Sequence, residues 1–231
     1  MPKLANRASG LRSLSVVGVV AVSILVGNVE EAFGLSSVTY NFDQTLAGTP
    51  PSGPTPWLTA AFTDVTPGTV DVTLSALGLT ESEMVNQWFF NLNPALNSSA
   101  LSFTQTGSSG SFASPAIGVG NDSFKAPYDG KYDIMFSFSP AAGSQFSQGD
   151  SVTFSITGIS GLTASDFLYQ NTPSSGHAPL YAAANIQTVG QAVIVDSPPL
   201  LPLTVPDGGA TVILLGLTLL SLEGARRAVC R

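Results

Sequence analysis

Apolar side chains recur at every second position through most of the chain, and this period constrains the fold more than any other feature. Successive side chains of a β-strand point to opposite faces of the sheet, so an alternating segment buries one face and exposes the other. No long interior stretch has the 3.6-residue period of an amphipathic helix. Strands are therefore expected at residues 38–42, 57–62 with Val65, 70–74, 88–92, 101–103, 132–138, 152–156, 167–169, 180–181 and 192–195.

Turn-forming residues separate these segments. Proline, glycine, serine and aspartate cluster at residues 50–54, 67–68, 129–130, 147–150 and 173–176. Many short strands joined by such turns predict an all-β protein. We expect an antiparallel β-sandwich of jelly-roll-like type over residues 35–204, with a β-barrel as the alternative.

The charge and the cysteine content of this region limit its function. Residues 35–204 hold eleven acidic side chains against two basic ones, Lys125 and Lys131, which is a formal charge of −9. Binding to nucleic acid or to an anionic membrane surface is disfavoured at that charge. The single cysteine, Cys230, lies outside this region, so no disulfide can stabilise the sandwich. A domain of this size can fold on its hydrophobic core alone.

A short pattern occurs twice. An alternating segment at 68–74 leads into Thr80 and Glu83, and another at 149–156 leads into Thr163 and Asp166. The Thr-x-x-acid spacing is that of a capping box, which opens a helical turn. We interpret the two copies as similar strand-to-turn corners, with an internal duplication as the alternative.

The first 34 residues have the form of a secretory signal peptide. Lys3, Arg7 and Arg12 precede an apolar run at 14–26, and no acid occurs among the first 29 residues. Ala32 and Gly34 supply the small residues that favour cleavage before Leu35. An uncleaved N-terminal anchor is the alternative.

The last 27 residues have three parts in a fixed order. Val205, Pro206, Asp207, Gly208 and Gly209 form an extended or turning motif. The uncharged run 210–222 would span only about 20 Å as a helix, short of the roughly 30 Å hydrocarbon core of a bilayer. Within the basic tail at 223–231, Arg226 and Arg227 place that end in the cytoplasm by the positive-inside rule.

This tail resembles the C-terminal sorting signal of the PEP-CTERM class, in the variant whose motif begins Val-Pro-Asp. In that class the tail is recognised and cut by exosortase, a membrane cysteine transpeptidase. Glu223 at the helix boundary and Cys230 near the end depart from the commonest forms. The region before the tail is similar, more loosely, to the β-sandwiches that precede such tails, at residues 57–64, 67–70, 88–93 and 129–133. A plain membrane anchor or a buried helix is the alternative.

Few residues indicate catalysis or metal binding. His177 is the only histidine, no Gly-x-Ser-x-Gly motif is present, and a surface loop is its expected place. Glu81 and Glu83 are a weak candidate pair for glycoside hydrolysis, because the capping box already accounts for one of them. Structural Ca²⁺ binding is a second weak candidate, which lacks the Asp-rich loop signature; its oxygen ligands would come from Asn121, Asp122, Asp129, Asp133 and Asp150.

Trp57 and Trp88 are the residues most open to two interpretations. Indole rings stack on sugars, so the pair could contact a glycan, but at strand spacing they are more often core residues. The main hypothesis is an exported, non-enzymatic bacterial protein of the cell surface or extracellular matrix, without a cofactor, whose partners are exosortase and the general secretion machinery. The alternative is a secreted polysaccharide-binding module or glycan-active hydrolase.

Overall fold

The computed structural model describes residues 36–196 except 81, 175, 177 and 188–190. The expected signal peptide (1–34) and sorting tail (205–231) lie outside the described residues. Within the described part, no helix is long and apolar enough to cross a membrane.

Short β-strands make up most of the described chain, together with two single-turn 3₁₀ helices. The helices are η1 (Ser98–Ala100) and η2 (Ala164–Phe167). The strands are β1 (Ser37–Ala47), β2 (Leu58–Thr66), β3 (Thr69–Ser75), β4 (Met84–Phe90), β5 (Ser102–Ser109), β6 (Ala116–Lys125), β7 (Lys131–Ser137), β8 (Phe146–Ser147), β9 (Ser151–Thr157), β10 (Ala182–Gln187) and β11 (Gln191–Asp196).

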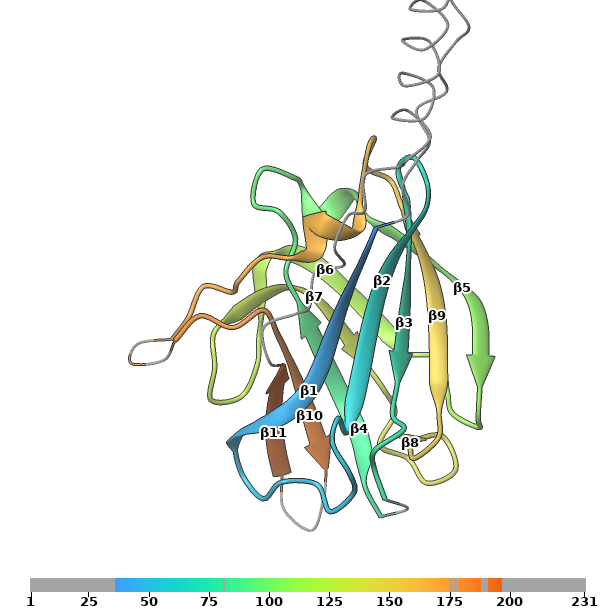
Figure 1. Cartoon of the computed structure of the whole chain (residues 1–231), viewed down its shortest axis with the longest axis vertical. Helices are drawn as coiled ribbons and strands as arrows, with labels where there is room; N and C mark the ends of the chain where they lie inside the picture. Colours follow the sequence, from blue (N-terminus) through green and yellow to red (C-terminus); the bar gives the residue numbers. More distant parts are fainter. Residues whose placement is uncertain (1–35, 81, 175, 177, 188–190, 197–231) are drawn as a thin grey trace, which may run out of the picture. The chain divides into compact units, whose positions relative to one another are not determined.

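The strands form two antiparallel five-stranded sheets packed face to face, which is a β-sandwich (Figure 1). The first sheet has the order β5-β9-β3-β2-β1, and the second has the order β11-β10-β4-β7-β6. The pairing of β1 with β11 joins the sheets, and its register shifts twice, between Phe42 and Gln44 and between Thr45 and Ala47. Such bulges bend a strand, so β1 can follow one sheet and then reach the other. The short strand β8 pairs with β4. The expected all-β sandwich is thereby confirmed.

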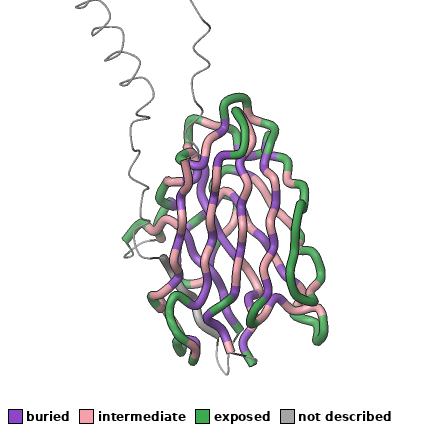
Figure 2. Tube along the Cα trace, turned by 45° about the vertical axis from the view of Figure 1, so that its right-hand side comes forward, coloured by how far each residue is buried: buried purple, intermediate pink, exposed green. Residues whose placement is uncertain are grey.

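The alternating pattern of the sequence becomes the two faces of each sheet. In β3 and β9, every second side chain is buried, and the intervening polar side chains lie on the outer face, where all but the exposed Thr157 are half-buried. Figure 2 shows this as purple and pink alternating along the central strands. The turn between β2 and β3 uses Gly68, whose φ of 81° is readily adopted only by glycine.

Aromatic rings dominate the core between the sheets. Phe62 stacks on Phe167 with ring centroids 4.4 Å apart and meets Phe90 edge-on at 5.2 Å. The hydroxyl of Tyr40, itself fully buried, donates to the carbonyl oxygen of Phe167 at 2.5 Å. These contacts fasten η2 against the ends of the first-sheet strands, so the core extends to the end of the sandwich.

A second, smaller apolar cluster lies on the outer face of the second sheet. Its buried members are Phe89, Ala126, Tyr132 and Ala183. Part of this outer face is therefore covered by other segments of the chain. Toward the opposite ends of β4, β7 and β10, the outer face carries polar side chains.

Two strand predictions were wrong, and a third was right only in part. Residues 167–169 do not form a strand, because η2 occupies 164–167 and its capping contacts determine the backbone there. Residues 180–181 precede β10 and do not belong to it. The strand expected at 88–92 is confirmed for residues 88–90, but the observed strand β4 begins earlier, at Met84, and ends at Phe90. Strands β6 and β8 were not predicted.

Candidate functional site

Both tryptophans are core residues. Trp88 is 0% exposed and meets Phe42 edge-on with ring centroids 5.2 Å apart. Trp57 is 7% exposed, and its Nε1 donates to the carbonyl oxygen of Gly53 at 2.9 Å. Neither indole presents a face to solvent, so the structure does not offer these two rings for contact with a glycan. The core interpretation agrees with their burial.

Several buried or half-buried acids hold loops by accepting main-chain N–H groups, an arrangement we call a carboxylate clamp. In the clamp of Asp64, Oδ1 accepts from the N–H of Ala164 at 2.6 Å. Its Oδ2 accepts from the N–H of Ser36 at 3.3 Å and from the hydroxyl of Ser36 at 2.5 Å. A carboxylate with hydrogen-bond donors on both oxygens tolerates burial far better than an unpaired one. Asp64 thus joins the end of β2 to η2 and to the start of β1.

The two predicted Thr-x-x-acid corners are also clamps. Glu83 accepts from the N–H of Thr80 at 2.8 Å and from the N–H of Ser52 at 2.7 Å. Asp166 accepts from the N–H of Thr163 at 3.0 Å. In both copies the N–H of the acid returns a hydrogen bond to the threonine carbonyl oxygen. The capping box and the helical turn expected from the spacing are confirmed at Thr163 and Asp166, where η2 begins. At Thr80 and Glu83 the acid still accepts from the threonine N–H, but the described residues form no helix there, and Glu83 is occupied in holding two loops.

Most of the weak calcium candidates accept hydrogen bonds of the same kind. Asp133 accepts from the N–H of Leu92 at 2.9 Å and from that of Asp122 at 2.7 Å. Asp150 accepts from the N–H of Ser147 at 2.8 Å. Asp129 is fully buried, and its Oδ2 accepts from the hydroxyl of Tyr132 and from Asn171. Among the described residues, no three His, Cys, Asp or Glu side chains are grouped to hold a metal ion.

Other predicted positions cannot be placed. His177, Glu81, the motif Val205–Gly209 and the arginines at 226 and 227 all lie outside the described residues. Their expected roles remain predictions.

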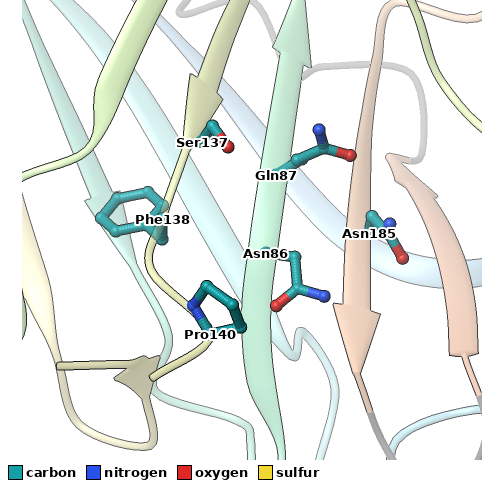
Figure 3. A pocket seen from close by; sticks show the side chains of 6 residues that line it. All are labelled: Asn86, Gln87, Ser137, Phe138, Pro140 and Asn185. Carbon is teal, nitrogen blue, oxygen red and sulfur yellow. The ribbon is translucent and has the colours of Figure 1, made fainter. Parts of the chain in front are cut away.

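The structure adds a hollow that the sequence did not indicate. It has a volume of about 310 Å³ and lies at the polar end of the outer face of the second sheet (Figure 3). Ser137 of β7, Gln87 of β4 and Asn185 of β10 stand in one row, because the register pairs Gln87 with both of the others. The lining residues are Asn86, Gln87, Ser137, Phe138, Pro140 and Asn185.

A bulge in β4 brings a second amide into this hollow. The pairing with β10 skips Asn86, since Val85 pairs with Ile186 and Gln87 pairs with Asn185. Val85 and the residue after Gln87 still face the core, so both Asn86 and Gln87 are turned away from it. Bulges of this kind redirect side chains and often lie beside binding sites.

Hydrogen-bonding capacity in the hollow is only partly used within the described residues. The Oδ1 atoms of Asn86 and of Asn185 are buried without a hydrogen-bond partner. The Nδ2 of Asn86 reaches Gln187 at 3.4 Å, and the Nε2 of Gln87 reaches only the thioether sulfur of Met135 at 3.5 Å. Asn185 is 4% exposed, and an unsatisfied buried acceptor costs about 1–3 kcal/mol. A polar hollow of this kind favours an occupant that donates hydrogen bonds.

Comparisons of the chain with known protein families, with curated proteins and with solved structures found no match.

Proposed function

We propose that this chain is an exported bacterial protein of the cell surface or extracellular matrix, sorted by an exosortase and without catalytic activity of its own. The observation that carries the proposal is the order of the tail: a Val-Pro-Asp-Gly-Gly motif, a short uncharged run and a basic tail. The N-terminal signal supports export independently. Exosortase and the general secretion machinery are then its processing partners.

The chemistry of the sandwich is compatible with this role. Its clamps use Asp64, Glu83, Asp133, Asp150 and Asp166 as acceptors for main-chain donors. These acids are therefore occupied in holding loops, and the same contacts give a cysteine-free domain local cross-links that form in any redox environment. Such a domain suits a cargo that must fold after crossing a membrane.

We also propose that the sandwich is of jelly-roll-like type. The antiparallel pair β3–β9 lies in the first sheet, and the chain continues from each of these strands to the antiparallel pair β4–β10 in the second. A two-stranded ribbon that crosses from one sheet to the other in this way supports that winding.

The processing proposal is tested on the protein recovered from cells. The full chain is expressed in a bacterium with an exosortase and in the same strain lacking the enzyme, and the intact mass and C-terminal peptide are measured. We expect a C-terminus close to Pro206 with the enzyme and a chain ending at Arg231 without it. An N-terminus close to Leu35 is expected in both strains.

A proline pair provides the matched control. Pro206→Ala changes the motif, whereas Pro202→Ala changes a proline four residues earlier in the same segment. We expect uncut protein for the first variant and normal cutting for the second. If the chain ends at Arg231 in the membrane fraction of the exosortase-positive strain, the proposed sorting is wrong and a plain anchor replaces it.

A further inference from the structure

We propose that the hollow on the outer face of the second sheet binds a neutral saccharide unit. The inference does not depend on how the chain is sorted, because it rests on the described sandwich alone. The residues that carry it are Asn86, Gln87, Ser137 and Asn185. Trp57 and Trp88, the aromatic candidates, have no part in it.

The first argument is that the hollow is lined by a buried hydrogen-bond acceptor that has no partner in the described part of the chain. Asn185 is 4% exposed and lines the hollow, and its Oδ1 has no hydrogen-bond partner in the described part of the chain. The Oδ1 of Asn86, on the neighbouring strand β4, is also buried without a hydrogen-bond partner among the described residues. Two unpartnered acceptors beside one hollow call for a ligand with at least two donors.

The second argument is charge. None of the six lining residues is ionisable in the neutral pH range, so an anion would find no basic side chain and a cation no carboxylate. The ligand that fits is therefore uncharged. Amide groups and the hydroxyl of Ser137 both donate and accept, and so do the hydroxyls of a sugar. Pro140, which is exposed, adds an apolar wall for the C–H groups of a sugar ring.

The third argument separates a saccharide from a peptide. A peptide that docks on a sheet usually adds a strand at an edge, where main-chain groups are unpaired. Strand β4 lies between β10 and β7, so it is not an edge strand, and at Gln87 it is paired on both sides. A peptide therefore finds no free strand edge beside Gln87 to extend. Its volume of about 310 Å³ is at the lower end of small-molecule sites, which suits one or two sugar residues of a longer polymer.

The test begins with a glycan array probed with the exported protein, purified from cells in a detergent that has no sugar headgroup. The array carries neutral hexose oligomers, oligomers that contain uronic acids, and oligomers of amino sugars. We expect binding to one or more of the neutral oligomers and none to the charged ones. The best neutral oligomer is then titrated by calorimetry, together with a neutral peptide library as a comparison.

Three variants connect binding to the hollow. Asn185→Ala and Gln87→Ala should each weaken binding about ten-fold or more, because each removes an amide that contacts the ligand. Asn41→Ala removes an amide from the first sheet and should leave binding unchanged. Ser137→Ala is the most conservative change and should weaken binding about three-fold or more. Thermal unfolding followed by circular dichroism shows which variants are folded.

The proposal is overturned if no neutral oligomer binds at about 10 mM, a limit set by the weakest affinities that calorimetry resolves. It is also overturned if the library peptides bind and the oligomers do not, or if folded Ser137→Ala and Gln87→Ala bind as the unmodified protein does. If the sorting proposal fails and the array still shows neutral oligomers bound at this hollow, the present inference stands by itself.

Discussion

Replacing Asp64 with alanine removes the acceptor of three hydrogen bonds that hold one end of the sandwich together. The N–H of Ala164 is buried and donates to the Oδ1 of Asp64 at 2.6 Å. The N–H and hydroxyl of Ser36 lie nearer to solvent and can turn to water. The variant therefore leaves one main-chain donor buried and unsatisfied.

The expected cost follows from these contacts. A hydrogen bond to a charged group contributes about 1.5–3 kcal/mol, and the two bonds from Ser36 contribute less because water replaces the carboxylate. We expect Asp64→Ala to lower the free energy of unfolding by about 3 kcal/mol. For a domain of this size, that corresponds to a melting temperature lower by roughly 6 to 12 °C.

Two further variants, Asp64→Asn and Asp71→Ala, are compared with Asp64→Ala. Asp64→Asn keeps one acceptor oxygen, which can still serve Ala164, so its cost should be about half as large. Asp71 lies on the outer face of β3, half-buried, and pairs in register with Thr63. Asp71→Ala should change the stability by about 0.5 kcal/mol or less.

Guanidinium unfolding, followed by circular dichroism on the exported protein, measures these differences. The slope of the unfolding free energy against denaturant should be the same for all variants, because the surface exposed on unfolding does not change. Equal losses for Asp64→Ala and Asp71→Ala would refute the clamp as a source of stability. Equal losses for Asp64→Ala and Asp64→Asn would refute the argument from the acceptor of Ala164.

Two further predictions use matched pairs and the same unfolding measurement. Trp57→Phe should cost about 1 kcal/mol more than Trp88→Phe, because the Nε1 of Trp57 donates to Gly53 whereas that of Trp88 has no partner among the described residues; the reverse order would contradict it. Gly158→Ala should cost about 3 kcal/mol or more, because φ is 102° and a Cβ would lie 2.1 Å from the carbonyl oxygen of Ala100. Gly143→Ala, with φ of 79° and no atom within 4 Å of its Cβ, should cost only about 1 kcal/mol, and similar losses in both would disprove the steric argument.

Alternation predicted most of the strands because burial on one face leaves a direct mark on the sequence. Strands β1, β3, β9 and β11 contain the segments expected from their apolar positions, and β2 and β7 each miss theirs by one residue. Strand β6 was missed because Gly118, Gly120, Asn121 and Asp122 are poor strand formers. Its register with β7 shifts between Val119 and Phe124, and Asp122 has a φ of 50° within that shift. Tertiary pairing, which no local pattern records, holds this irregular strand in place.

The error at residues 167–169 has a different cause. Two local signals overlap there: the apolar pair Phe167 and Leu168 suggests a strand, and the Thr163–Asp166 spacing suggests a helical turn. The carboxylate of Asp166 accepts from the main-chain N–H of Thr163 and so satisfies a donor at the start of the turn. Phe167 then reaches the core from the end of η2 by stacking on Phe62. The capping signal therefore decided the local structure.

The hollow could not be predicted at all. Gln87, Ser137 and Asn185 are neutral residues far apart in the sequence, and no motif links them. They meet only because β4 pairs with β7 and β10 in one particular register, and Asn86 joins them through a bulge. A polar side chain at an outward position of a strand is normally predicted to be exposed to solvent. That such a side chain is buried becomes clear only once the neighbouring strands are placed.

The carboxylate clamps have a consequence for how this domain can vary. Each clamp demands an acid at one position, but the partner is a main-chain N–H, which every amino acid except proline supplies. Substitutions at Ser52, Thr80, Leu92 or Ala164 can therefore keep the clamp as long as packing allows them. An ion pair would require two residues to change together, whereas a clamp constrains one. The loops at the ends of the sandwich are thus open to sequence drift while the acids that hold them are not.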